Sequence, residues 1–548
     1  MYIANTLKDK IMKKQIILLT FIIVASLNAC SKMLNIDEHG VMPIDDFYKT
    51  DEQVLQANAA SYYAFTVNSD FQWGATFEYY YVALNSMLSD EAWSGGESRG
   101  DFADGEKLNE YTFGIENPII SSYYTNLYTM IYRANIVLDK TVPGQSDIID
   151  MCRAEALVFR SWANFELASM WGNAPLVTHP LESDEYQVKN SEPGELWAAI
   201  ETDLKEAINS GKLSHKKDLN DKTTWRITEE YAMALLGKAM IWQGKYSEAI
   251  PYLKAVADSP LYGLFRGDYA DIWRMANKFS CESLFELNRV GDMNNRRVCQ
   301  MYVFFSWRTQ YFSSLPPEMQ TTGWGWMVPQ KGLYDDFVEY EGESSYRRRG
   351  SLLTWEEVRD EHNTRISNGS TIYQDKYFGW KYRFLTEDTL GGQFNYCISN
   401  FHVMRLAEVF LLLAEAYIQS GDSGAALPYI NAIRTRAQLP ELASCDMNVL
   451  KTEKKLELCF EEIRYKDLIR WGDAYDVLKD QGCAIPFTTS NWASPDSTDP
   501  TTDVLTVDYR NYYTSSDQYG FKKGKHELLP YPQSEILSNP NIIQNPGY

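Results

Sequence analysis

After its first thirty residues, the sequence lacks any apolar run long enough to cross a bilayer as a helix. Proline and glycine are scarce, at 20 and 32 of 548 residues, and no segment has low complexity, which excludes collagen-like and disordered chains. Basic residues are also few, since 52 lysines and arginines face 74 acids and the net charge is −22. Such a chain repels phosphate backbones, so no nucleic-acid partner is expected.

Metal-binding patterns are missing as well. The six histidines form no HExxH motif and the cysteines form no CxxC pair, so neither a catalytic metal site nor a zinc ribbon is indicated. Asp101, Asp104, Glu106 and Glu110 lie close together but lack the spacing of an EF-hand. No cofactor is therefore expected, and a structural calcium ion at these acids is left open.

The N-terminus has the pattern of an export signal. Lys13 and Lys14 precede an apolar stretch over residues 16–25, and residues 27–30 (Leu-Asn-Ala-Cys) resemble a bacterial lipobox. We expect a signal peptide over 1–29 with Met12 as the better start, lipidation at Cys30 and a linker over 30–44. Several acyl chains would make a stable membrane anchor. The alternative is an ordinary secretory signal with an incidental cysteine.

Cleavage before Cys30 would leave a chain of net charge −25, because four lysines and one aspartate are removed with the signal. Seven further cysteines would remain, an odd number at irregular spacing. That count argues against a disulfide framework and predicts that most of these side chains are buried free thiols.

Helical periodicity dominates two parts of the chain. It predicts helices over residues 153–172 and 196–210, and helix pairs over 228–243 with 247–258 and over 403–420 with 425–438. Small residues in the first helix of each pair, with a glycine-containing turn after it, are typical of stacked tetratricopeptide-like repeats. The apolar helix over 403–418 is predicted to lie inside the stack. Residues 261–402 and 441–548 are predicted to form irregular layers of short elements that hold the binding residues.

A series of motifs runs through the chain in a specific order. The motifs lie at residues 45–52, 132–138, 153–175, 405–416, 430–440, 457–472 and 529–548. In this order they resemble the SusD/RagB family, surface lipoproteins of Bacteroidetes nutrient-uptake systems, along nearly the whole mature length.

The resemblance implies a mainly α fold. A superhelix of tetratricopeptide-like pairs, mainly within 120–260 and 403–440 of a single domain over 45–548, would support a loop-rich ligand-binding face. It also implies an oligosaccharide ligand, a TonB-dependent (SusC-like) transporter as partner, and a lipid-anchored place on the outer membrane facing the exterior. The acidic residues after Cys30 begin only at Asp37, so the exterior orientation depends on the family alone.

Aromatic residues are concentrated in one loop-rich segment, residues 302–337. Flat rings can cover the apolar faces of sugars at little entropic cost, although large aromatics are also common core residues. Trp307, Tyr311 and Trp326 are therefore candidate ligand-binding residues, whereas Trp324, between two glycines, is interpreted as structural.

The loop after Asp90 provides the second set of candidates: Asp90, Trp93, Arg99, Asp101 and Phe102. In the family, the loop at this place often contacts ligand. Trp93 lies between charged residues and turn formers, which is a poor setting for a core residue, so it is favoured as a stacking tryptophan.

Nothing in the sequence indicates catalysis. Residues 96–100 match GxSxG, but we expect neither the buried strand nor the helix that a nucleophile elbow needs around it. Charged residues at helical spacing over 457–470 are interpreted as structural ion pairs. The predicted function is a non-enzymatic receptor that captures a glycan for uptake. A peptide or glycoconjugate receptor, a surface glycoside hydrolase and a pure scaffold are the alternatives.

Overall fold

The computed structural model describes residues 47–65, 77–289, 300–389 and 397–548. The predicted signal peptide, Cys30 and the linker over 30–44 lie outside these residues. The chain divides into Met1–Thr50 and a compact unit, Asp51–Tyr548, to which everything below refers.

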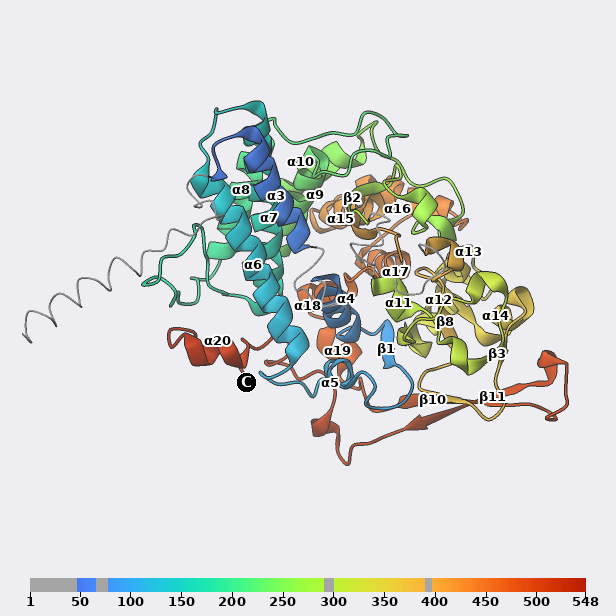
Figure 1. Cartoon of the computed structure of the whole chain (residues 1–548). Helices are drawn as coiled ribbons and strands as arrows, with labels where there is room; N and C mark the ends of the chain where they lie inside the picture. The colour runs from blue at the N-terminus through green and yellow to red at the C-terminus, as the bar shows by residue number, and fades with distance from the viewer. Residues whose placement is uncertain (1–46, 66–76, 290–299, 390–396) are drawn as a thin grey trace, which may run out of the picture. The chain divides into compact units, whose positions relative to one another are not determined.

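A stack of antiparallel helices forms one part of this unit (Figure 1). Its members are α3 (Asp51–Ala64), α6 (Pro118–Lys140), α7 (Asp147–Trp171), α8 (Glu195–Asn209), α9 (Glu229–Trp242), α10 (Tyr246–Ala257), α15 (Leu406–Gln419), α16 (Ser423–Arg436) and α17 (Met447–Glu457). From α6 onward each helix packs on the next, and α10 packs directly on α15, although the two are far apart in sequence. The predicted helix pairs are thus confirmed as one continuous stack.

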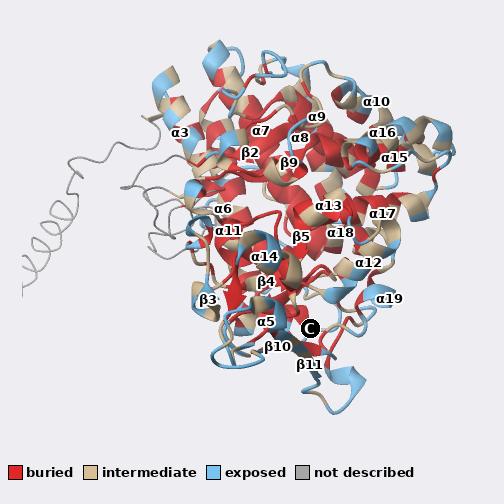
Figure 2. Ribbon diagram, turned by 90° about the vertical axis from the view of Figure 1, so that its right-hand side faces the viewer, coloured by how far each residue is buried: buried red, intermediate tan, exposed pale blue. Residues whose placement is uncertain are grey.

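Local sequence signals explain where these helices begin and end. Thr228 accepts a hydrogen bond from the backbone N–H of Tyr231 and so caps α9, and Ser146 caps α7 in the same way. Gly172 ends α7 with φ +74°, a conformation that favours glycine. Figure 2 shows α7, α9 and α15 largely in the red of buried residues, as predicted for an inner helix over 403–418.

The predicted start of that helix is wrong. Residues 401–405 form strand β9 (Phe401–Arg405), which pairs with β2 (Ser283–Leu287), and α15 begins only at Leu406. Both elements are buried, and apolar residues continue from the strand into the helix on either side of Arg405. Periodicity alone could not separate them.

Short elements pack beside the stack. The remaining helices are α4 (Phe77–Met87), α5 (Ala103–Asn109), α11 (Gln300–Phe305), α12 (Lys331–Glu341), α13 (Tyr346–Ser351), α14 (Trp355–His362), α18 (Arg464–Trp471), α19 (Ala474–Leu478) and α20 (Gln533–Ser538). The strands pair as β1 (Ala92–Gly95) with β4 (Trp326–Pro329), β3 (Phe312–Ser314) with β6 (Arg365–Ile366), β5 (Leu352–Thr354) with β8 (Tyr377–Gly379), and β10 (Ile485–Asn491) with both β11 (Val504–Arg510) and β7 (Thr371–Ile372).

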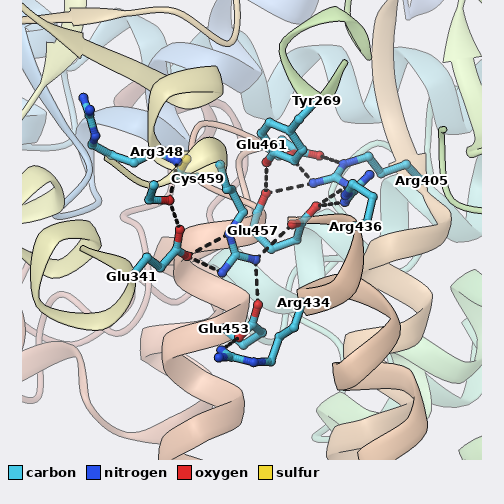
Figure 3. A network of polar contacts seen from close by, with 12 residues as sticks. Tyr269, Glu341, Arg348, Arg405, Arg434, Arg436, Glu453, Glu457, Cys459 and Glu461 are labelled. Atoms are coloured by element: carbon cyan, nitrogen blue, oxygen red, sulfur yellow. Dashed lines mark hydrogen bonds and ion pairs between the residues drawn. The ribbon is translucent and has the colours of Figure 1, made fainter. Parts of the chain in front are cut away.

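A buried network of charges joins the stack to these short elements (Figure 3). Arg405 binds Glu282, Glu457 and Glu461 through contacts of 2.7 Å, and Glu457 also binds Arg347 and Arg436. Within 457–470, Arg464 pairs with Asp90, Asp467 with Lys454 and Arg470 with Glu415. The predicted structural ion pairing over 457–470 is confirmed. The buried faces of these helices therefore carry charged as well as apolar side chains.

The C-terminal tail wraps around the end of α7. The indole N–H of Trp171 donates to the carbonyl oxygen of Pro530 at 2.9 Å, and the amide of Asn545 donates to the carbonyl oxygens of Trp171 and Leu529. The closing motif at 529–548 therefore has a structural role.

Candidate functional site

A glycine-rich loop over residues 96–101 lies at the end of β1 and is held against β4. Gly95 pairs with Trp326 in the strand register, and the N–H of Gly96 donates to the carbonyl oxygen of Gly325 at 2.6 Å. Gly95 has φ +62°, and a Cβ there would come within 2.3 Å of that same oxygen. The close approach therefore requires glycine.

Asp101 is the polar centre of the site. Its Oδ2 accepts hydrogen bonds from the Glu97 N–H at 3.0 Å and from the indole N–H of Trp326 at 3.1 Å, and it forms an ion pair with Arg308. Arg308 also binds Glu97 at 2.9 Å and donates to the carbonyl oxygen of Trp324 at 2.6 Å. Asp101 and Glu97 are exposed, so this cluster of two carboxylates and one guanidinium faces solvent.

Aromatic rings surround these charges. Trp326 and Trp324 are both partly exposed, with ring centroids 4.7 Å apart. Phe102 supports Trp326 from below by a parallel stack at 4.2 Å. The hydroxyl of Tyr311 donates to the carbonyl oxygen of Gly96 at 3.1 Å, and burial raises the pKa of Tyr311 to about 12, so its hydroxyl stays neutral at physiological pH.

Arg99 points to the other side of the same loop. Its guanidinium binds the carboxylate of Glu110 through two contacts, at 2.5 and 2.9 Å, and donates to the Tyr373 hydroxyl at 3.3 Å. It also lies 4.4 Å from the ring centre of Tyr512. The hydrogen bonds that Arg99 donates to the Glu110 carboxylate raise the pKa of Arg99 further above its usual range, so the side chain remains a cation.

Five of the eight predicted ligand-binding residues lie on or beside this loop: Asp101, Phe102, Tyr311 and Trp326 on one side, and Arg99 on the other. Phe102 is only 4% exposed, so it supports Trp326 from within the protein and does not itself face solvent. A binding role for the other four stays a prediction. Glu97 and Arg308 were not among the predicted residues, and Trp324, which is partly exposed, was predicted to be structural. A lone arginine within an aromatic segment was the available signal for Arg308.

The other three predicted residues do not face this site. Trp93 is 3% exposed and packs with Val328 and Tyr373, so the expectation that it is a poor core residue is wrong. It lies on β1, and β4 covers that strand from a distant part of the chain.

Trp307 is likewise buried, and its indole N–H donates to the carbonyl oxygen of Met319 at 3.0 Å. Asp90 lines a charged cleft of about 550 Å³, where it binds Arg464 and Lys455. Burial would raise the pKa of Asp90, but these two cations outweigh that effect and hold it well below its usual range. None of the three side chains is therefore available to stack on or bind a ligand beside the loop.

The four acids considered for calcium have other partners. Asp101 binds Arg308, Asp104 binds Lys107, Glu110 binds Arg99, and Glu106 accepts the N–H of Gly100 at 2.6 Å. Within the described ranges, no group of three or more His, Cys, Asp or Glu side chains is arranged to hold a metal ion.

The GxSxG stretch is not built as a nucleophile elbow. A short buried strand, β1, does precede it, contrary to our expectation, but α5 begins only at Ala103. Ser98 is exposed, and in the described part of the chain no hydrogen bond links its hydroxyl to a histidine.

Comparisons with known proteins agree with this architecture. Residues 364–548 match the model of the SusD family, and residues 48–240 match a SusD-like model described as starch-binding and associating with the outer membrane. The chain belongs to the SusD family. Among relatives, SusD-like protein P25 of Formosa agariphila is 23% identical over 98% of this chain and all of its own, and a SusD-like protein of Bacteroides ovatus is 22% identical over 78% of this chain and 81% of its own.

Solved structures of SusD-like proteins share the helical-repeat fold, which confirms the predicted fold class. A laminarin-binding SusD-like protein superposes with a TM-score of 0.73 at 25% identity, covering 91% of this chain and all of that one. Surface glycan-binding protein A from Bacteroides thetaiotaomicron, solved with laminarihexaose, gives 0.70 at 21% identity, again over 91% of this chain and all of that one. None of the described helices combines the length and apolar character that crossing a membrane requires.

Proposed function

We propose that this SusD-like protein is a lipid-anchored receptor on the cell surface. It binds a glycan without chemical change and delivers it to a TonB-dependent outer-membrane transporter. The observation that carries the proposal is the solvent-facing cluster in which Trp324, Trp326 and Tyr311 lie beside Asp101 and Arg308. Partly exposed rings suit the apolar faces of sugars, and the charged groups suit their hydroxyls.

The charge balance of the cluster supports a neutral ligand. Arg308 compensates only one of the two negative charges on Asp101 and Glu97, so the cluster stays slightly acidic and disfavours an anionic ligand. Sugar hydroxyls can both donate to carboxylates and accept from the guanidinium. The ligand of a laminarin-binding relative makes β-glucan oligosaccharides the first candidates.

The positions of the carboxyl groups with raised pKa values support binding without hydrolysis. A glycosidase needs a carboxyl group with a raised pKa that can reach the glycosidic oxygen. Burial raises the pKa of Glu91 to about 8 and that of Glu462 well above its usual value, but both side chains are buried away from the loop. Burial also raises the pKa of Glu106 beneath the loop, but that side chain is buried and accepts the N–H of Gly100.

Calorimetry against a panel of oligosaccharides and a peptide digest tests this proposal. We expect laminarihexaose or another panel sugar to bind, Trp326→Ala to weaken binding about tenfold, which is about 1.4 kcal/mol, and Tyr311→Phe to weaken it less. Trp225→Ala is the matched control, because Trp225 is 43% exposed and packs against α3, outside the cluster.

Three outcomes would contradict the proposal. Binding of the peptides alone would make the protein a peptide receptor, and release of reducing ends from a polysaccharide would make it a hydrolase. Binding of neither sugars nor peptides would leave only a scaffold.

For delivery, the expected result is that a TonB-dependent barrel co-purifies with the full-length protein, and that Cys30→Ala releases the protein from the membrane.

A further inference from the structure

Exposed tyrosines lie beside the candidate site in the segment 441–548, which was predicted to carry binding residues but from which no single residue was named. Strands β10 and β11 form a long hairpin, and the chain after β11 passes Arg99. Tyr509 and Tyr512 are 46% and 48% exposed there, among the more exposed large apolar residues of the described chain. Exposed rings that are held in place are typical of binding surfaces.

Tyr512 is held in a defined position. The Arg99 guanidinium lies against its ring, 4.4 Å from the centre, and is itself fixed by the two contacts to Glu110. The hydroxyl of the next residue, Tyr513, donates to the same Glu110 carboxylate. Tyr509, on the hairpin, donates to Asp375 at 2.7 Å. The ring of Tyr512 therefore needs little further ordering when a ligand binds.

The loop over residues 96–101 stands between two separate groups of rings. Asp101 and Glu97 bind Arg308 on the side of the loop where Trp324 and Trp326 lie. Arg99, which lies between these two acids in sequence, binds Glu110 and packs against the ring of Tyr512 on the other side. In the described part of the chain, no ring contact joins Tyr512 to Trp324 or Trp326. One small sugar would contact one group, but a chain lying across the loop would contact both.

We propose that Tyr512 and Arg99 form an additional subsite that extends the glycan site toward the β10–β11 hairpin and makes the protein prefer longer oligosaccharides. This inference rests on the proposed function. Glu110 neutralises Arg99, so the subsite suits a neutral chain: the tyrosine ring covers a sugar face, and guanidinium N–H groups donate to hydroxyls.

Calorimetry with two laminarin oligosaccharides tests the subsite. Laminaritriose and laminarihexaose are titrated into wild-type protein, Tyr512→Ala, Tyr512→Phe and the control Tyr475→Ala, whose tyrosine is 43% exposed on α19. If laminarin oligosaccharides do not bind, the same pair of lengths is taken from the panel sugar that does.

We expect Tyr512→Ala to weaken binding of the hexaose about tenfold and of the triose less than twofold. Tyr512→Phe and Tyr475→Ala should leave both affinities unchanged. If wild-type protein binds but Tyr512→Ala binds the hexaose normally, or loses both lengths equally, the subsite is refuted while the proposed function stands. If wild-type protein binds no sugar at all, both are refuted. Thermal melting shows that each variant is folded.

Discussion

Replacing Arg405 by methionine tests whether the buried charge network holds the two parts of the fold together. Arg405 is 1% exposed, and it binds the carboxylates of Glu282, Glu457 and Glu461 and the carbonyl oxygen of Glu457. Methionine keeps much of the volume but leaves these carboxylates short of one cation. Removing one partner from a buried ion pair costs about 3–5 kcal/mol.

The neighbouring cations keep the expected loss within this range. Arg436 still binds Glu282 and Glu457, and Lys381 still binds Glu461 at 2.9 Å. For a unit of about 500 residues, an unfolding entropy of about 1 kcal/mol/K converts the loss into a fall in Tm of about 3–5 °C. Differential scanning calorimetry measures this shift.

Arg349→Met is the matched control. Arg349 also binds two acids, Glu357 and Glu361, but its side chain is 35% exposed, and exposed pairs contribute about 0–1 kcal/mol. We expect its Tm to stay within about 1 °C of wild type. Equal shifts in the two variants would refute the reasoning, because burial would then make no difference to the value of the ion pairs.

The stability of the Arg405→Met variant also has a predicted pH dependence. Burial alone would raise the pKa of Glu457, but Arg436, Arg405 and Arg347 outweigh it and hold that pKa at about 2, against an ordinary value of 4.5. A carboxyl with a depressed pKa stabilises the fold above its unfolded-state pKa, and this contribution is lost as the pH falls toward the folded-state value. The stability gap between wild type and Arg405→Met should therefore narrow between pH 4.5 and 2, and a constant gap would contradict the assignment.

Three further predictions concern other residues. Gly95→Ala should displace the loop over 96–101 and weaken glycan binding, because its Cβ would clash with the Gly325 carbonyl. Gly100→Ala is the control: Gly100 has φ +93° but no neighbour within 4 Å of an added Cβ, so this change should weaken binding less. Equal glycan affinities of the two variants in calorimetry would contradict this. Burial lowers the pKa of His526 to about 3. The neutral side chain therefore contributes fully to stability above pH 6.5, and this contribution is lost as the pH falls toward 3. Between these pH values, the unfolding free energy of His526→Asn, measured in urea, should depend less on pH than that of wild type. A thiol reagent should label the partly exposed Cys281 and Cys483 of the folded unit before the buried cysteines, which are Cys152, Cys397, Cys445 and Cys459. Mass spectrometry that found the reverse order would contradict the structure.

Helices were the most predictable part of the fold because their signals are local. The caps at Ser146 and Thr228, the glycine after α7 and the apolar spacing of α9 and α10 all lie within a few residues of the element they define. The same signals failed at residues 401–405, where a buried strand continues the apolar run of α15. Over α17 and α18 the buried faces carry charged side chains, and the partners of those charges, some of them on other elements, could not be predicted locally.

Burial of individual aromatic residues could not be predicted in the same way. Trp93 and Trp326 each lie within two residues of a glycine, and the two strands that carry them pair with each other. Only the packing of distant segments leaves Trp326 partly exposed and covers Trp93 with Tyr373 and Val328. The position of Tyr512 beside Arg99 depends likewise on a hairpin formed four hundred residues further along the chain.

By itself the sequence determined the helical repeats and the family, because propensity, capping and motif order are properties of neighbouring residues. Tertiary structure alone decided which rings and charges reach solvent. The exposure of a side chain depends on which residues pack over it. Those residues come from distant parts of the chain, so the local sequence does not predict them.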